Sequence, residues 1–405
     1  MRKRLKEFCD YISRGAAPDY VDESPYKVMN QATFSKGYID ESNVRFSSKA
    51  PEYAQIHKGD LLMASTGGGV LGKVAYFDKD ENDFYADSHV SILRNSKGIN
   101  SMKFLYYWFS PRYDEINATM VKGSTNQTEL QRNYLVNYEI DVPSLSVQQR
   151  IVSYLDDKTA KINKAVSLLQ KKRDAYTRLK TSIINRAVTR GFNPNVKLKD
   201  SGVDWIGMIP ENWIIRRFKE VFSHYTTGFT PESKNAKNFE GQNTWITIAD
   251  MTHKYVSESN LYLSDEAIQK AQQPITPKGS LLFSFKLSIG KVAFAGKNVY
   301  TNEAIVSLMP SNRYNLNFFY YYLPIVCLNN ATENIYGAKM LNQKIISNMI
   351  FAVPPKEEQL AIADYLDTHC SRIDHAISIV DKQIDAYTRL KKSLINEVVT
   401  GKRKV

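Results

Sequence analysis

The sequence predicts an α+β fold: two tandem globular parts of mixed β-structure with small helices, separated by two long helices. Three observations support this prediction. The chain repeats itself at an offset of 211 residues, the end of each copy carries apolar residues seven apart, and the rest of each copy is rich in short strand and turn patterns. We expect the two long helices to pair as an antiparallel coiled coil, with a pseudo-two-fold relation between the copies.

The repeat is strongest near the end of each copy. The stretch PSLSVQQRIVSYLD matches PPKEEQLAIADYLD, and Asp174–Lys180 is identical to Asp385–Lys391. Earlier segments match more loosely, for example KGDLL with KGSLL. We therefore expect a first globular part, a first helix, a linker with a second globular part, and a second helix, at 1–142, 143–190, 191–353 and 354–405.

Both helical segments carry a heptad pattern without internal Pro or Gly, which is typical of a long coiled-coil helix. Roughly 40 residues at about 1.5 Å each give a rod of about 60 Å, which cannot bury its apolar stripe alone. Two separate surface helices are the alternative. The predicted seam consists of Leu155, Ile162, Leu169, Tyr176 and Ile183, and of Leu366, Ile373, Val380, Tyr387 and Leu394.

The globular parts show strand patterns around a shared Gly-Lys turn. The apolar runs DLLMAS and SLLFSF lead into GKVAYF and GKVAFA, and YKVMNQATF and NTWITIADM are also rich in strand-forming residues. The aromatic stretches NSMKFLYYWF and NLNFFYYYL indicate helices that pack in the core.

The first Gly-Lys turn partly matches a phosphate-binding loop, because Gly67, four residues, Gly72 and Lys73 fit the start of that motif. The residue after the lysine is Val74 where the motif needs a Mg²⁺-binding hydroxyl, and a strand is predicted where a helix should begin. In the second copy, Phe285 replaces Gly67. We therefore expect a turn that leads into a strand and no ATP site.

Composition favours a polyanionic partner, most simply double-stranded DNA. The 405 residues carry a net charge of +12 with an isoelectric point near 9.2, and residues 143–190 alone carry +8 against +1 for 354–405. A generally basic surface is the alternative. We expect no membrane contact and a cytoplasmic location, because no apolar run is long enough to span a bilayer, the N-terminus lacks a signal-peptide pattern, and the three cysteines form no disulfide framework.

No pattern supports catalysis or metal binding by this chain. The six histidines include one close pair, His369 and His375, whose spacing does not suit zinc and whose counterparts in the first copy are lysines. The motif NPNV at 193–196 lacks the second proline and the aromatic residue of amino-methyltransferases, and a linker explains it better. We expect no catalytic residue, no metal and no cofactor in this chain.

Candidate DNA contacts lie near the Gly-Lys turns and in two polar stretches, VKGSTNQTEL and IYGAKMLNQKI, near the end of each globular part. Small and amide side chains beside a glycine suit base edges and phosphates, although an ordinary solvated loop is an equal alternative. The candidates are Ser65, Thr66, Lys73, Lys122, Ser124, Asn126, Gln127, Lys286, Lys291, Lys339 and Asn342.

Two motifs resemble the specificity subunit of type I restriction–modification systems, and the resemblance extends along nearly the full chain. VDWIGMIPENW at 203–213 is similar to that family's lead-in to a target-recognition domain. The second motif leads into the spacer helix and comprises Val353-Pro354-Pro355, Glu358-Gln359, Ile362 and Tyr365-Leu366-Asp367. The first copy departs from it at Ser144 and Val147, and it lacks the lead-in, beginning at RLKEF, which matches RRFKEV at 216–221.

The resemblance implies that each globular part is a target-recognition domain for one half of a bipartite, asymmetric DNA sequence. The helices would form a spacer and a docking surface for two modification subunits, which would use S-adenosylmethionine to methylate adenine. Restriction subunits would add ATP- and Mg-dependent translocation and cleavage. The alternatives are a self-contained DNA methyltransferase or nuclease with its own recognition domain, and a coiled-coil scaffold without a role in DNA binding.

Overall fold

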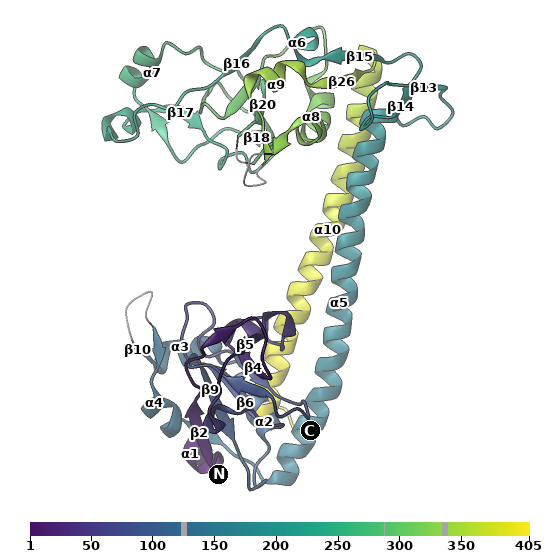
Figure 1. Cartoon of the computed structure of the whole chain (residues 1–405). Coiled ribbons are helices and arrows are strands. Elements are labelled where there is room, and N and C mark those ends of the chain that lie inside the picture. Colours follow the sequence, from purple (N-terminus) through teal and green to yellow (C-terminus); the bar gives the residue numbers. More distant parts are fainter. Residues whose placement is uncertain (123–127, 287, 334–338) are drawn as a thin grey trace. The chain divides into compact units, whose positions relative to one another are not determined.

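The chain forms two compact units in a computed structural model that describes residues 1–122, 128–286, 288–333 and 339–405 (Figure 1). The first unit is Met1–Lys171 with Val380–Val405, and the second is Lys172–Ile379. The two long helices are α5 (Leu145–Arg190) and α10 (Lys356–Val399), and each contributes one segment to each unit. The boundaries predicted from the repeat lie near the helix ends, whereas the division into units passes through the helices.

The first globular part is closed by its own first and last strands. β1 (Arg2–Arg4) pairs antiparallel with β12 (Glu139–Asp141), immediately before α5 begins. The elements between them are α1 (Leu5–Phe8), β2 (Tyr11–Arg14), β3 (Tyr20–Val21), β4 (Tyr26–Met29), β5 (Arg45–Ser47), β6 (Leu61–Ala64), β7 (Val74–Tyr76), β8 (Phe84–Ala86), β9 (Val90–Arg94), α2 (Met102–Phe109), α3 (Tyr113–Thr119), β10 (Val121–Lys122), β11 (Glu129–Leu130) and α4 (Arg132–Asn137).

Two four-stranded sheets build this part, with strand orders β2-β9-β6-β7 and β3-β5-β4-β8. Successive residues of a strand face opposite sides, and β6 buries both sides. Leu61 and Met63 join the core cluster that contains α2, while Leu62 and Ala64 join the cluster that contains Phe84 of the other sheet. This two-sided burial explains why DLLMAS is a continuous apolar run rather than an alternating one.

The second globular part repeats this arrangement. β15 (Ile214–Arg217) pairs with β26 (Ile350–Val353) just before α10, and the five-stranded sheet β16-β23-β20-β21-β18 contains the counterparts of β2-β9-β6-β7. Its remaining elements are β13 (Leu198–Asp200), β14 (Met208–Pro210), α6 (Phe218–Val221), β16 (Tyr225–Thr227), β17 (Asn243–Ile246), β18 (Tyr255–Val256), β19 (Tyr262–Leu263), α7 (Asp265–Ala271), β20 (Leu281–Ser284), β21 (Val292–Ala295), β22 (Tyr300–Thr301), β23 (Ile305–Leu308), α8 (Leu316–Asn330), β24 (Thr332–Glu333), β25 (Lys339–Met340) and α9 (Gln343–Asn348).

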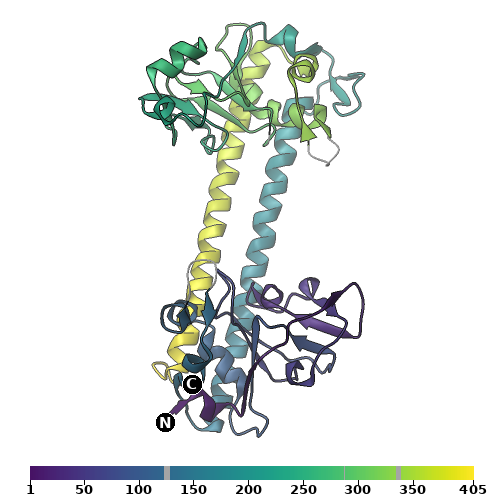
Figure 2. The same cartoon turned by 60° about the vertical axis from the view of Figure 1, so that its left-hand side comes forward.

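The long helices pair antiparallel within each unit, as the heptad pattern predicts, and Figures 1 and 2 show them side by side. In the first unit, Leu155 of α5 and Val398 of α10 share one core cluster. In the second unit, Val188 of α5 and Leu366 of α10 share another. In the first unit, the N-terminal part of α5 therefore packs against the C-terminal part of α10. In the second unit, the C-terminal part of α5 packs against the N-terminal part of α10.

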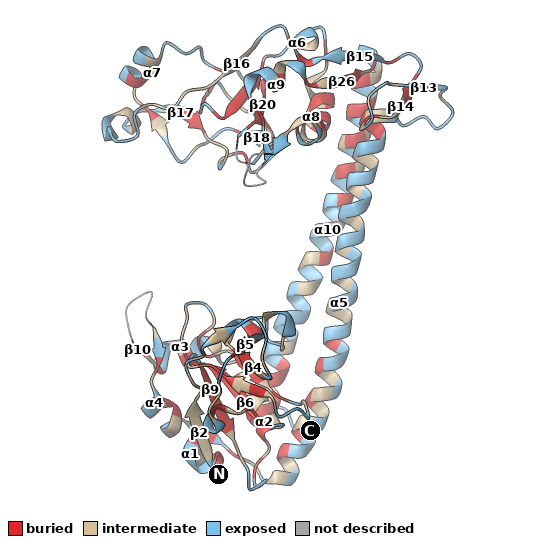
Figure 3. Ribbon diagram, in the orientation of Figure 1, coloured by how far each residue is buried: buried red, intermediate tan, exposed pale blue. Residues whose placement is uncertain are grey.

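Burial along the predicted seam is uneven (Figure 3). Six seam residues are buried, namely Leu155, Ile162, Leu366, Ile373, Val380 and Leu394. Leu169, Tyr176 and Ile183 are half-buried. Tyr387 is 38% exposed, which corrects its assignment to the seam. A helix with about 3.6 residues per turn drifts away from a strict seven-residue repeat, so a later heptad position can turn outward.

A buried glutamine joins each long helix to the globular part that precedes it. The side-chain oxygen of Gln148 accepts a hydrogen bond from the backbone N–H of Ser101, which caps α2, and its amide donates to the Pro143 carbonyl. Gln359 makes the same two contacts with Asn315 and Pro354 in the second copy. In each copy, the glutamine of the motif that leads into the long helix (the helix-entry motif) therefore fixes the angle between that helix and the aromatic helix before it, α2 or α8.

A tyrosine–aspartate pair repeats this attachment two turns further along each long helix. The hydroxyl of Tyr107 donates to Asp156 at 2.6 Å, and that of Tyr321 donates to Asp367 at 2.5 Å. Burial, followed by the adjacent carboxylate, raises the pKa of both tyrosines, which keeps them protonated as donors. This hydrogen bond gives a structural reason for the aspartate that ends the sequence Tyr-Leu-Asp in both long helices.

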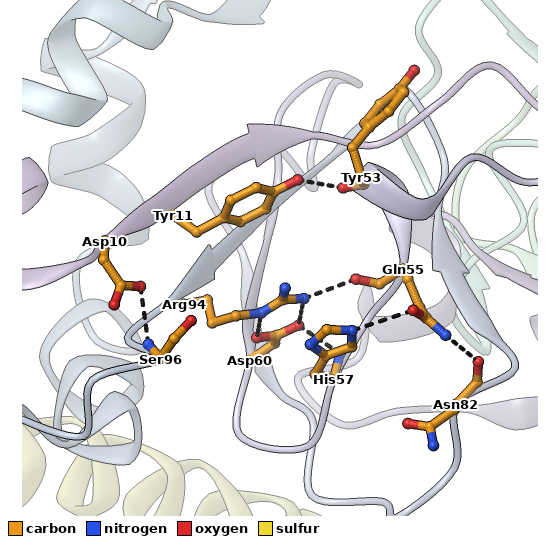
Figure 4. A network of polar contacts seen from close by, with 9 residues as sticks. All are labelled: Asp10, Tyr11, Tyr53, Gln55, His57, Asp60, Asn82, Arg94 and Ser96. Carbon is orange, nitrogen blue, oxygen red and sulfur yellow. Dashed lines mark hydrogen bonds and ion pairs between the residues drawn. The ribbon is translucent and has the colours of Figure 1, made fainter.

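An ion pair between the buried Asp60 and the half-buried Arg94 lies in the first globular part (Figure 4). Arg94 donates to both carboxylate oxygens of Asp60 at 2.7 Å and to the Gln55 carbonyl at 2.8 Å. The strand register places Ser280 and Met309 at the corresponding positions, where the Ser280 hydroxyl lies 3.5 Å from the Met309 sulfur. One architecture therefore accommodates either a charged or a neutral pair at this position.

Replacing one member of this pair should destabilise the protein more than replacing both. Asp60→Ser leaves the half-buried Arg94 charge without its partner and should cost about 3 kcal/mol of unfolding free energy, the lower end for a buried pair. The double variant Asp60→Ser/Arg94→Met reproduces the pair of the second part and should recover most of that loss. Urea unfolding followed by circular dichroism measures both effects.

Asp80→Ser is the matched control, because Asp80 forms an ion pair with Lys58 and its side chain is 89% exposed. We expect its effect to stay below about 0.5 kcal/mol. An Asp60→Ser variant as stable as this control, or a double variant with purely additive losses, would contradict the structural interpretation.

Candidate nucleic-acid interface

The Gly-Lys turn has the same backbone conformation in both copies. Gly72 and Gly290 have positive φ angles of 85° and 77°, a region that favours glycine. The lysine that follows leads into β7 in the first copy and into β21 in the second, so the strand predicted after the turn is confirmed. No helix begins here, which excludes the phosphate-binding-loop interpretation.

The lysine of each turn connects the turn to a neighbouring loop. The ammonium of Lys73 donates to the Ser35 carbonyl at 2.6 Å, and that of Lys291 donates to the Ile248 carbonyl at 2.7 Å. Both side chains are half-buried. An ammonium has three N–H donors, so this contact leaves capacity for a phosphate. The shared backbone contact gives a structural reason for a lysine at both positions.

Ser65 and Thr66 differ in their accessibility. Ser65 is fully buried, and its hydroxyl lies 2.6 Å from that of Ser91 on the adjacent strand β9. This burial corrects the prediction that Ser65 contacts DNA, because its hydroxyl has no exposed surface. Thr66 is half-buried, and its hydroxyl lies 2.6 Å from Nδ1 of His89.

An antiparallel strand pair, here called a hairpin, lies at each polar stretch. β10 pairs with β11 in the first globular part, and β24 pairs with β25 in the second. Lys122 lies in β10, and its side chain is outside the described structure. Ser124, Asn126 and Gln127 also lie outside the described residues.

The other candidates of the second part, Lys286, Lys339 and Asn342, are exposed. Lys286 follows β20, and Lys339 lies in β25, where its ammonium is 3.4 Å from the Leu328 carbonyl. Asn342 caps α9 by accepting a hydrogen bond from the Ile345 N–H at 2.9 Å. Its side chain therefore has a structural role in addition to the predicted contact with DNA.

A polar cluster at the base of the first hairpin was not predicted. Arg14 of β2 forms an ion pair with Glu129 of β11 and donates to the carbonyls of Ser65 and Leu130. Arg14 directly precedes Gly15, which corresponds to Gly228 in the second copy, so the repeat marked the location but not the role. This cluster fixes the hairpin to the sheet.

The described ranges contain no cluster of three or more His, Cys, Asp or Glu side chains placed to hold a metal ion. None of the helices in these ranges is both long enough and apolar enough to cross a membrane.

Relatives of this chain are specificity subunits. The MjaIX specificity subunit of Methanocaldococcus jannaschii is 26% identical over 167 residues, a match that spans 40% of this chain but only 38% of that protein. The EcoR124I/EcoR124II specificity subunit of Escherichia coli is 24% identical over 374 residues, or 87% of this chain and 81% of that protein.

Two solved structures share the fold along almost the whole chain. A chain from work on complex assembly and conformational transition of the type I restriction–modification system aligns with a TM-score of 0.74 and 18% identity, covering 98% of this chain and 97% of that one. The HsdS subunit of Thermoanaerobacter tengcongensis aligns with a TM-score of 0.52 and 19% identity, covering 99% and 96%.

The family model for the type I restriction modification DNA specificity domain matches residues 1–169 and 210–380, which is well over half of the chain. Each match contains one globular part and part of the long helix that follows it. The chain therefore belongs to the type I restriction–modification specificity family.

Proposed function

We propose that this chain reads a bipartite, asymmetric sequence in double-stranded DNA, with one half-site bound by each globular part. The observation that carries this proposal is the unequal divergence of the repeat. The helices share an identical seven-residue stretch, whereas the globular parts share a fold but differ in residues such as the Asp60–Arg94 and Ser280–Met309 pairs. Two different globular parts suit recognition of two different DNA sequences. Two similar helices suit binding of two similar partner subunits.

Exposed apolar residues on the helices support docking of two similar modification subunits. Leu168 and Ile379 occupy equivalent positions and are 57% and 45% exposed. Leu179 and Leu390 are also equivalent and are 47% and 51% exposed. Large apolar side chains exposed at matching positions in both copies suit a repeated protein interface.

The remaining assignments belong to the partners. Modification subunits would supply S-adenosylmethionine and adenine methylation, and restriction subunits would supply ATP- and Mg-dependent translocation and cleavage. This chain would contribute recognition and positioning without catalysis, and we place the complex in the cytoplasm. Within the two polar stretches, Ser124, Asn126, Gln127, Lys339 and Asn342 are the proposed base contacts, and each lost contact should cost about 1–3 kcal/mol of discrimination.

Exchange of one globular part tests the proposed function. Replacing residues 1–142 with the corresponding part of another specificity subunit should change one half of the methylated motif. The other half and the spacing should persist, because residues 191–353 and both helices are unchanged. Genome-wide mapping of methylated adenines, in cells that also carry the modification subunit, provides the measurement.

The reciprocal exchange of residues 191–353 is the matched control and should change only the other half of the motif. If either exchange altered both halves together, or left the motif intact, the two globular parts would not be independent readers.

Removing the turn lysines should weaken DNA binding irrespective of sequence. Lys73→Met or Lys291→Met deletes one proposed phosphate contact, so the slope of log affinity against log salt should fall by about one. The matched controls are two exposed lysines, Lys58, which precedes β6, and Lys278, which precedes the equivalent strand β20. Salt titrations by fluorescence anisotropy measure the slopes, and equal slopes for all four variants would remove the turn lysines from the interface.

Charged substitutions at the exposed apolar positions should impair docking without unfolding the chain. Leu179→Lys should weaken binding of one modification subunit by about tenfold or more, and adding Leu390→Lys should weaken the second, because buried apolar area is lost. Native mass spectrometry of the assembled complex measures the stoichiometry. Thr177→Lys, at an exposed position on another face of α5, is the control, and an unchanged stoichiometry in the double variant would place the docking surface elsewhere.

A further inference from the structure

A pocket of about 310 Å³ lies in the first unit where the Gly-Lys turn meets α10. The turn, the loop after η1 (Gln31–Phe34), the end of α2 and α10 all contribute to its lining. Four lining residues are lysines, namely Lys36, Lys73, Lys391 and Lys392, and none of the described lining residues is Asp or Glu.

Two of these lysines have acidic partners outside the lining. Lys36 pairs with Asp40 at 2.8 Å, and Lys392 pairs with Asp114 at 3.0 Å. The other two, Lys73 and Lys391, donate to neutral oxygens. Their acceptors are the Ser35 carbonyl at 2.6 Å and the Asn163 side chain at 2.8 Å. Within the described residues, neither Lys73 nor Lys391 forms an ion pair.

In the second unit, the contact equivalent to that of Lys391 has a negative partner. Lys180 is equivalent to Lys391, and both lie in the identical seven-residue stretch. Lys180 contacts both carboxylate oxygens of Asp374 at 2.7 Å, and Asp374 is equivalent to Asn163. The first unit therefore keeps the lysine and the hydrogen bond but lacks the negative charge.

The surroundings of Lys391 make this missing charge significant. The side chain is half-buried, and desolvation lowers its pKa from the ordinary lysine value. Tyr106, Phe109 and Tyr113 form an aromatic side of the pocket, and the Lys73 ammonium lies 6.0 Å from the centre of the Tyr113 ring. An anion in this partly desolvated site would interact more strongly with the two ammonium groups than it would in water.

We propose that this pocket binds a phosphate group between Lys73 and Lys391. Two ammonium charges without acidic partners match the charge of about −1.5 to −2 that a phosphate monoester carries near neutral pH. Lysine binds phosphate as a point charge through charge-assisted hydrogen bonds. A pocket of this size accommodates a small ligand with an apolar side and a few polar anchors. This site shares Lys73 with the proposed DNA interface, and a competition experiment distinguishes a DNA phosphate from a free one.

Isothermal titration calorimetry of the full chain with inorganic phosphate, and separately with ATP, at constant ionic strength tests the proposal. We expect saturable binding to one site. Lys391→Gln should weaken it by about tenfold or more through loss of a charged donor. Asn163→Asp should do the same while retaining the lysine, because it supplies the carboxylate that Asp374 provides in the other unit.

Asn185→Asp is the matched control, because it makes the same charge change at an exposed position on α5 and should leave the affinity unchanged. Asn163→Asp is nearly isosteric, so it keeps the test decisive if Lys391→Gln fails to fold. Absence of saturable binding to both inorganic phosphate and ATP, or wild-type affinity in Asn163→Asp, would overturn the proposal.

A competition experiment identifies the source of the phosphate. If a DNA duplex displaces bound phosphate from the wild-type protein, and Asn163→Asp weakens duplex binding as it weakens phosphate binding, the pocket binds a phosphate of the DNA. If phosphate binds equally well at saturating duplex, the ligand is free phosphate or a nucleotide. Both results support the pocket, and they distinguish a DNA phosphate from a free ligand.

Discussion

The attachment of each globular part to its long helix depends on one buried glutamine. Gln148 and Gln359 are 1% and 2% exposed, and each bridges the start of a long helix and the cap of an aromatic helix. An unpaired buried amide is costly, so these hydrogen bonds tolerate little rotation between the two helices. The pairs Tyr107–Asp156 and Tyr321–Asp367 add a second anchor further along, and two anchors define the direction of each helix relative to the globular part that precedes it.

The two copies also reveal which changes the architecture accepts. Asp60 and Arg94 in one copy correspond to Ser280 and Met309 in the other, so both members of a contact changed together. Asn163 and Lys391 correspond to Asp374 and Lys180, and here only one member changed. Coordinated replacement preserves a balanced interior, whereas the single replacement leaves an ammonium without an acidic partner beside a pocket.

The repeat was sufficient to predict the long helices, their antiparallel pairing and the strands around the Gly-Lys turn, because these features depend on local periodicity and a strong internal match. The burial of Ser65 was not predictable, since it depends on pairing with a strand 26 residues away. The glutamine of the helix-entry motif was visible in the sequence, but its role required the position of the α2 cap. Comparing the copies at Asn163 and Asp374, outside the seam, would have indicated the missing charge.

The division of the chain into units has a consequence for the order of synthesis. Residues Val380–Val405 complete the first unit, although the second unit, Lys172–Ile379, is translated before them. At about 5–20 residues per second, the ribosome needs roughly ten to forty seconds to pass through that intervening segment. During this interval Ile151 and Leu155 lack Leu394 and Val398, with which they share a core cluster. The globular part made first must therefore wait with an uncovered apolar surface, so the nascent chain is most vulnerable to aggregation at its earlier-made end.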